Sequence, residues 1–176
     1  PLGAATESAR LFRTTLPDTD VPVYLVDHPG FFDRDQLYGT PEGDYPDNAQ
    51  RFIFFSKAAL AAPKAIQWAP DIYHCNDWQT ALVPAYLKLT HAHDSFTRNA
   101  RSVLTIHNLA YQGVFPRETF ELTGLGWEHF NWQELEFYGR VNLLKAGIVF
   151  ADILNAVSKR YAQEIQTAEY GCGLDG

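Results

Sequence analysis

The sequence is poor in cysteine and has neither a long apolar run nor a concentration of basic residues. Its two cysteines, Cys75 and Cys172, lie far apart without C-x-x-C spacing, which gives little support to a disulfide framework or a zinc site. No apolar stretch approaches the roughly 20 residues that span a bilayer. The formal net charge is -7, so a surface for nucleic acid or an anionic membrane is not expected. The predicted partners are neutral or small, and no metal or cofactor is predicted.

The remaining composition is that of a folded globular chain. Its 176 residues are 46% hydrophobic and 20% charged, which is sufficient for one sizeable core. The start, PLGAATESAR, has no basic region followed by an apolar stretch, so a secretory leader is not indicated. We therefore expect a cytoplasmic protein, or a plastid one if the source is a plant.

Strand-like and helix-like segments alternate along the chain. Asp47 and Ser158 are each placed to cap a following helix, and Pro84 predicts a bend or a new start within another helix. The pattern predicts an α/β fold with a Rossmann-like, doubly wound parallel sheet and helices on both faces. The predicted strands are 21–26, 71–75, 102–107 and 152–158, and the predicted helices are 47–66, 79–90, 138–151 and the segment from 159.

Polar and aromatic residues gather directly after two of these strands. His107 and Asn108 follow one strand, and Asp77 and Trp78 follow the strand before it. In an open α/β sheet, the loops after the strands build the ligand crevice. A carboxylate, an imidazole, amides and an aromatic face suit a sugar, which has apolar C–H faces and a rim of hydroxyls. Neither loop is a glycine-rich turn running into a helix, so phosphate binding is not indicated there.

Four longer motifs carry a family resemblance. They are HCNDWQTALVPAYLK, TIHNLAYQGVFP, FYGRVNLLKAGIVFAD and AVSKRYAQEIQTAEYGCGLDG. In order and spacing, they closely resemble the N-terminal domain of bacterial glycogen synthases and plant starch synthases, and the similarity covers nearly the whole chain from about Val21. The resemblance implies a retaining glucosyltransferase of the two-Rossmann-domain (GT-B) type that moves glucose from ADP-glucose or UDP-glucose to the non-reducing end of an α-1,4-glucan.

The resemblance also suggests roles for individual residues. It implies that His107 lines the cleft and contacts the transferred glucose, and that Asp77 accepts hydroxyl hydrogen bonds or adds negative potential. It implies transfer without an enzyme nucleophile and without a metal. The remaining residues expected to bind substrate or to position the loop are Asn108, Tyr111, Gln112, Gly113 and Trp78.

Two departures from the family pattern concern domain organisation. Nothing in residues 1–20 resembles the K-T-G-G-L loop that opens the family and touches the donor phosphates. The nucleotide-binding domain would begin after Gly176. We therefore expect residues 1–176 to be an incomplete N-terminal, acceptor-side domain that lacks the C-terminal nucleotide-sugar domain.

Simpler interpretations stay open for some of these residues. Asp77 could be the N-cap of the helix that starts near Gln79, and Trp78 fits a core position as well as a sugar platform. For the isolated chain, the alternative to catalysis is a glucan-binding or partner-binding module. The terminal GCGLDG matches G-x-G-x-x-G, but it follows a helix rather than a strand, so it does not predict a nucleotide site.

Overall fold

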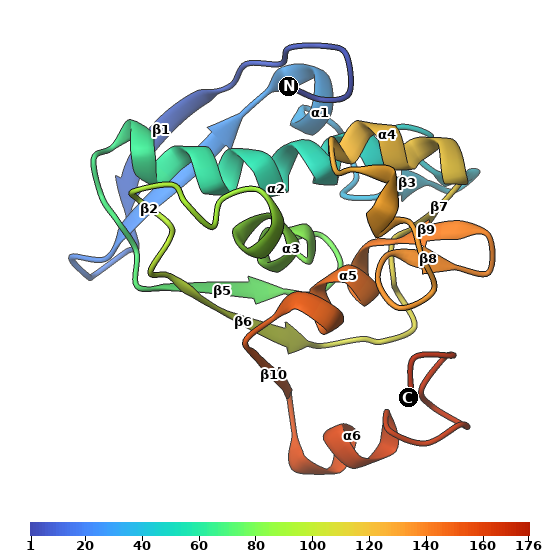
Figure 1. Ribbon diagram of the computed structural model, residues 1–176. Coiled ribbons are helices and arrows are strands. Elements are labelled where there is room, and N and C mark those ends of the chain that lie inside the picture. The colour runs from blue at the N-terminus through green and yellow to red at the C-terminus, as the bar shows by residue number, and fades with distance from the viewer.

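The computed structural model describes residues 1–176 and has a three-stranded parallel sheet at its centre (Figure 1). The strand order is β10 (Ile153–Ala156), β6 (Arg101–Ile106), β5 (Ile72–Asn76). These three strands confirm the predicted segments, and their parallel pairing confirms the α/β class.

The connecting helices α3 (Leu82–Leu89) and α5 (Leu143–Phe150) cover one face of this sheet (Figure 1). Both crossovers step in the same direction, from β5 to β6 and from β6 to β10, so their helices lie on the same side. Gly147 lets α5 approach closely, because a Cβ there would lie 2.7 Å from the Cβ of Ala81. Helices were predicted on both faces of the sheet, but within these residues the connecting helices cover only one face.

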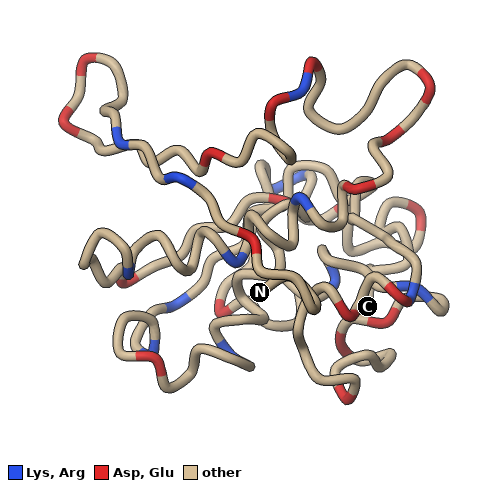
Figure 2. Tube along the Cα trace, turned by 90° about the horizontal axis from the view of Figure 1, so that it is seen from above, with Lys and Arg blue, Asp and Glu red and all other residues tan.

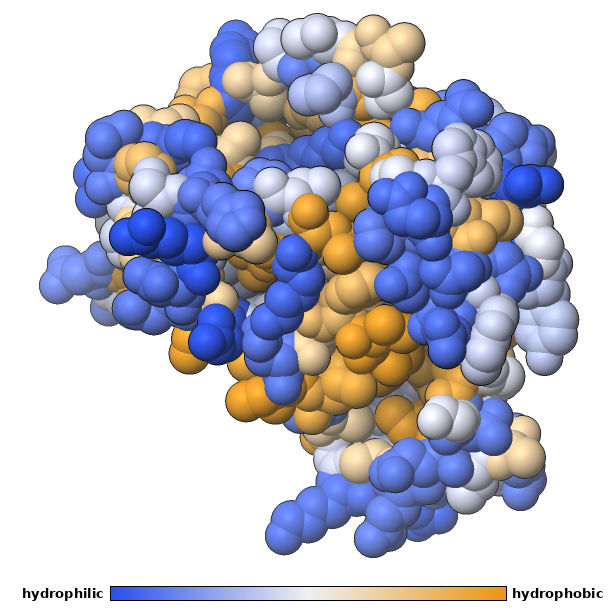
Figure 3. All heavy atoms as spheres, viewed as in Figure 1, coloured by the Kyte–Doolittle hydropathy of each residue, from blue (hydrophilic) through white to orange (hydrophobic).

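On the opposite face of the sheet, the side chains of the two edge strands are exposed within these residues. Ile72 and Ile153 are 59% and 57% exposed. Figure 3 shows apolar atoms at the surface where β5, β6 and α5 lie. Lysine and arginine are scattered among the acidic residues along the chain, without one basic face (Figure 2). No helix is both long enough and apolar enough to cross a membrane.

The longest helix, α2 (Asn48–Ala65), packs its apolar side chains against α3. The predicted capping of this helix by Asp47 is not observed. Asp47 occupies the N-cap position as predicted, but its side chain caps no helix N–H. Its carboxylate instead accepts two hydrogen bonds from Arg34, at 2.9 and 2.5 Å. A charge-assisted bidentate pair competes effectively with a cap, which explains the difference.

The predicted strand 21–26 exists as β2 (Pro22–Asp27), but it does not join the parallel sheet. It pairs antiparallel with β1 (Arg10–Thr15), a strand that the sequence did not predict, in a separate two-stranded sheet. Every residue of β1 except Leu11 is exposed. The turn between the two strands sets the register of such a hairpin. Its first strand therefore carries no alternating hydrophobic pattern from which it could be predicted.

The predicted helix 138–151 begins only at Leu143, because its first part is β9 (Arg140–Asn142). This strand pairs with β7 (Val114–Phe115) and β8 (Glu136–Phe137) in a small antiparallel sheet. The Asn142 side chain then caps α5 by accepting from the N–H of Lys145. The short helices of the same region are η1 (Arg117–Thr119), α4 (Phe120–Thr123) and η2 (Trp127–His129).

The other predicted helices are confirmed with small shifts. The predicted helix 79–90 forms from Leu82 with Pro84 in its first turn, where no N–H is needed. Ser158 caps α6 (Lys159–Glu164) by accepting from the N–H of Tyr161, as predicted. The segment 28–46 contains α1 (Pro29–Phe32), β3 (Gly39–Thr40) and β4 (Gly43–Asp44).

Candidate active site

Two predicted site residues meet at the carboxyl ends of β5 and β6. Asn76 ends β5 and is paired with Thr105 of β6. The next residues along the chain are therefore neighbours across the sheet edge, which brings Asp77 beside His107 although they are 30 residues apart. The register of the sheet sets the geometry of this pair.

Asp77 connects the two strand ends. Its N–H donates to the carbonyl of Thr105 at 3.0 Å. Its Oδ1 accepts from the N–H groups of His107 and Asn108, at 2.7 and 3.3 Å. The backbone of Asp77 lies in the left-handed region, at φ 54°, a conformation that costs free energy and that clusters at functional sites.

The N-cap interpretation of Asp77 is not supported by these contacts. Helix α3 begins five residues later, with Ala81 at its N-cap and no side-chain cap. The hydroxyl of Thr80, rather than Asp77, bonds locally to the N–H and carbonyl of Asn76, at 2.7 and 2.9 Å. The Asp77 carboxylate is thus committed to the strand end that carries His107.

The His107 side chain is exposed and is oriented by one neighbour. Its Nε2 lies 3.0 Å from Oδ1 of Asn76. Because an amide oxygen can only accept, Nε2–H is the donor of this hydrogen bond. The sequence did not single out Asn76, because a terminal strand residue has no spacing signal of its own.

The loop after β6 is held at both ends and exposed in the middle. The Asn108 side chain accepts from the N–H of Ala110 at 3.1 Å, forming a local turn. Tyr111 at its tip is 68% exposed. Gln112 is buried, accepting from Asn142 at 2.7 Å and donating to the carbonyl of Cys172 at 3.1 Å.

Trp78 and Gly113 contact each other beneath this loop. Trp78 is buried, with its ring edge-to-face against Phe52 at 4.7 Å between centroids. Gly113 has φ +62°, and a Cβ there would lie 2.4 Å from the indole ring. The structure therefore places Trp78 in the core, supporting the loop, rather than at the surface as an open platform.

This contact predicts that Gly113→Ala destabilises the protein by about 2 kcal/mol or more, since strain and overpacking add. Gly139→Ala is the matched control, because Gly139 has φ +79° with nothing within 4 Å of its Cβ position. Chemical unfolding of both variants separates backbone strain from the clash with Trp78. Equal losses of unfolding free energy in the two variants would show that the indole contact is unimportant.

A surface cavity of about 370 Å³ opens beside Asp77. Its wall includes Asn76 and Gln79 together with Phe32 and Tyr38 from the segment 28–46. The Tyr38 hydroxyl accepts from Nε2 of Gln79 at 2.8 Å. The sequence pointed to this segment only as a long loop after a strand, and it gave no reason to select Tyr38.

The chemistry of this edge is that of hydrogen bonding to neutral hydroxyls. It offers a carboxylate, an imidazole and amides beside aromatic side chains, the groups that recognise a sugar. No lysine or arginine lies within residues 74–79 or 107–113. No three histidine, cysteine, aspartate or glutamate side chains come together as a metal site.

The chain matches a known protein family over almost its whole length. The family model described as the starch synthase catalytic domain matches residues 2–176. The chain belongs to this family. The resemblance noted in the sequence is thereby confirmed for the whole chain.

Named members of the starch synthase family include bacterial and plant proteins. The chain is 54% identical over 156 residues to a glycogen synthase of Koribacter versatilis, covering 89% of this chain and 32% of that protein. It is 52% identical over 157 residues to glycogen synthase 2 of Geobacter sulfurreducens, again covering 89% and 32%. The chain thus spans about a third of the length of these relatives.

A solved starch synthase structure has the same fold. It is the catalytic domain of starch synthase IV from Arabidopsis thaliana bound to ADP and acarbose, with TM-score 0.81 and 36% identity over 95% of this chain and 34% of that one. The chain is therefore part of a Rossmann-like domain of the GT-B type, as its sequence predicted.

Proposed function

We propose that these residues form the acceptor-side, N-terminal domain of a retaining glucosyltransferase. The full-length enzyme transfers glucose from ADP-glucose to the non-reducing end of an α-1,4-glucan. The observation that carries the proposal is the Asp77–His107 pair at adjacent strand ends in a starch synthase family member. ADP-glucose is favoured over UDP-glucose because the similar plant starch synthase was solved with ADP.

The geometry gives each site residue a role in this reaction. As the nucleoside diphosphate leaves, positive charge develops at the anomeric carbon of the glucose. The fixed carboxylate of Asp77 supplies negative potential there, and His107 orients the sugar through a ring that Asn76 holds in place. The protein contributes position and electrostatics, without a covalent intermediate.

The loop residues present the glucan to this pair. Asn108 forms the turn and Tyr111 offers an exposed ring to the acceptor. Gln112 fixes the loop through its two buried hydrogen bonds. The close contact between Gly113 and the ring of Trp78 fixes the distance between this loop and the core.

The assay of this function uses the full-length protein that contains these residues. Radiolabelled ADP-glucose and glycogen should yield labelled glucan, with UDP-glucose as the competing donor. Release of the label by an enzyme specific for α-1,4 links confirms retention. No incorporation from either donor would refute the proposal. We further propose a cytoplasmic location, or a plastid one in a plant.

Matches to named glycogen synthases support an enzyme domain rather than a separate binding module. The 176 residues in isolation are nevertheless expected to lack the donor side of the reaction. Neither strand-end loop contains lysine or arginine, and the phosphates of a nucleotide sugar need basic groups or helix N-termini aimed at them. A retaining transfer also needs donor and acceptor enclosed together, and these residues span about a third of the length of the similar glycogen synthases.

We therefore predict that the 176-residue chain alone transfers no glucose and has no strong affinity for ADP-glucose, while it binds maltooligosaccharides weakly. Calorimetric titration with each ligand and a labelled-glucose assay measure this, after circular dichroism has shown that the chain is folded. Micromolar donor affinity or measurable incorporation would show that these residues already contain the whole catalytic site.

A further inference from the structure

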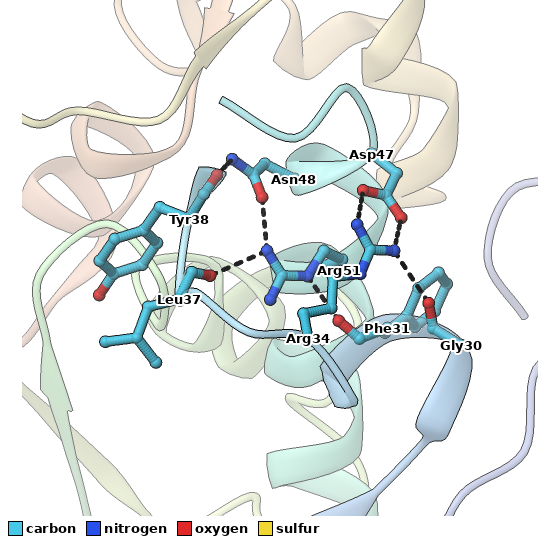
Figure 4. A network of polar contacts seen from close by, with 8 residues as sticks. All are labelled: Gly30, Phe31, Arg34, Leu37, Tyr38, Asp47, Asn48 and Arg51. Atoms are coloured by element: carbon cyan, nitrogen blue, oxygen red, sulfur yellow. Dashed lines mark hydrogen bonds and ion pairs between the residues drawn. The ribbon is translucent and has the colours of Figure 1, made fainter. Parts of the chain in front are cut away.

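Arg51 on α2 is a buried cation without a carboxylate partner. Its side chain is among the least exposed polar ones, at 3%. The nearby carboxylate of Asp47 pairs with Arg34 instead (Figure 4). Burial, and then the neighbouring charge of Arg34, lowers the pKa of Arg51. A buried charge is costly unless hydrogen bonds compensate for its lost hydration, so the partners of this guanidinium matter.

Those partners are backbone carbonyls of the segment 28–46. The guanidinium donates to the carbonyls of Phe31 and Leu37, at 2.7 and 3.0 Å, and to Oδ1 of Asn48 at 2.6 Å (Figure 4). Asn48 in turn donates to the carbonyl of Tyr38 at 2.8 Å. One face of α2 therefore holds three carbonyls of this segment.

The held segment forms one wall of the cavity beside Asp77. The carbonyls at Phe31 and Leu37 immediately precede Phe32 and Tyr38, whose side chains line that cavity. Tyr38 then reaches Gln79, two residues after Asp77. A shift of the backbone at these carbonyls would move both aromatic rings relative to the site.

The shape of the guanidinium explains why arginine serves here. Its planar fork reaches acceptors on different peptide groups at the same time, whereas the ammonium of lysine is a single point charge on a flexible stem. The rings of Tyr45 and Phe52 lie 5.2 and 5.1 Å from the guanidinium carbon and limit its movement. Replacing buried ionic groups by apolar ones is often neutral for stability, so packing alone does not require this charge.

We propose that Arg51 is a positioning residue of the candidate active site, which holds Phe32 and Tyr38 in place against the cavity that contains Asp77. This proposal rests on the proposed function, because its effect on catalysis presumes glucosyl transfer at this edge of the sheet. Arg51 itself lies behind the wall and contacts no reacting atom.

A double-mutant cycle in the full-length enzyme tests the proposal. Arg51→Lys is expected to lower kcat/KM about tenfold in the wild-type background, but less than about threefold when Tyr38→Ala has already removed the positioned side chain. The matched control is Arg13→Lys on the exposed strand β1, which should change neither value. Equal losses in both backgrounds would overturn the proposal, because a merely structural role is additive.

Hydrogen exchange provides a readout that does not depend on activity. Arg51→Lys should speed exchange in residues 33–46 and leave β5 and β6 unchanged; unchanged exchange in that segment would overturn the proposal. If Arg51→Lys does not fold, Asn48→Ala replaces it in both experiments, since it removes one carbonyl contact and one acceptor. If the wild-type enzyme transfers no glucose, the proposed function fails, and the exchange result alone decides whether Arg51 holds the segment.

Discussion

Replacing His107 by alanine is expected to lower glucosyl transfer by the full-length enzyme about 10²-fold or more, the effect of losing one preorganised polar group at a reacting centre. The fold should be unaffected, because the exposed ring makes one hydrogen bond, to Asn76. Alanine also keeps the backbone N–H that donates to Asp77. The carboxylate therefore stays in place, and the loss reports on the imidazole alone.

The measurement is kcat/KM for ADP-glucose with glycogen as acceptor, together with the unfolding midpoint of each protein. His93→Ala is the matched control, because His93 is exposed and lies in the turns that lead into the first residue of β6, at the opposite end of that strand from His107. Near-normal transfer by a folded His107→Ala enzyme would remove His107 from the site.

Asp77→Asn is expected to lower kcat/KM by a similar factor, about 10², while changing the unfolding free energy by less than about 1 kcal/mol. The asparagine oxygen can still accept from the N–H groups of His107 and Asn108. Only the negative charge disappears, so this variant should lose activity while it keeps its unfolding free energy.

Asp77→Ala distinguishes the two functions of the same side chain. It removes the acceptor as well as the charge, so the two exposed N–H groups lose a partner worth about 0.5–1.5 kcal/mol per hydrogen bond. Alanine is also strained at φ 54°. Urea unfolding and steady-state kinetics on both variants complete the comparison. Full turnover by Asp77→Asn would make Asp77 an anchor of the strand ends and nothing more.

Two of the strands that the sequence predicted, β5 and β6, have a clear buried face. β6 carries the buried Leu104 and Ile106 within a β-branched run, and β5 alternates the buried Tyr73 and Cys75 with exposed residues. A period of two against a core is visible in a single sequence. The cap at Ser158 was predictable for a different reason, because capping depends only on residues that are close together in the chain.

The parts that were missed depend on pairing with another strand rather than on a pattern of their own. Residues 140–142 have apolar spacing compatible with a helix, but pairing with β7 and β8 makes them a strand. The exposed strand β1 forms only because β2 lies opposite to it. Propensity and periodicity are weak where tertiary pairing decides the structure.

The same division applies to the site. The rule that ligands bind at the carboxyl ends of parallel strands located Asp77 and His107, and the structure places them in contact. The side chains of Tyr38 and Gln79 form a hydrogen bond although 41 positions separate them in the sequence. Arg51 donates to the carbonyl of Leu37, which lies 14 positions earlier. Such contacts have no local pattern, so the cavity wall and the residues that hold it became apparent only in three dimensions.

The position of Asp77 and His107 on a sheet ladder affects how the sequence can vary. Thirty positions separate the two residues, and the turns of residues 91–100 lie between α3 and β6 on that path. Because paired backbone of β5 and β6 fixes both residues, an insertion in those turns lengthens the connection without displacing either side chain. Doubling the length of a flexible loop costs only about 0.6 kcal/mol. Gain and loss of residues between α3 and β6 is therefore compatible with an unchanged candidate active site.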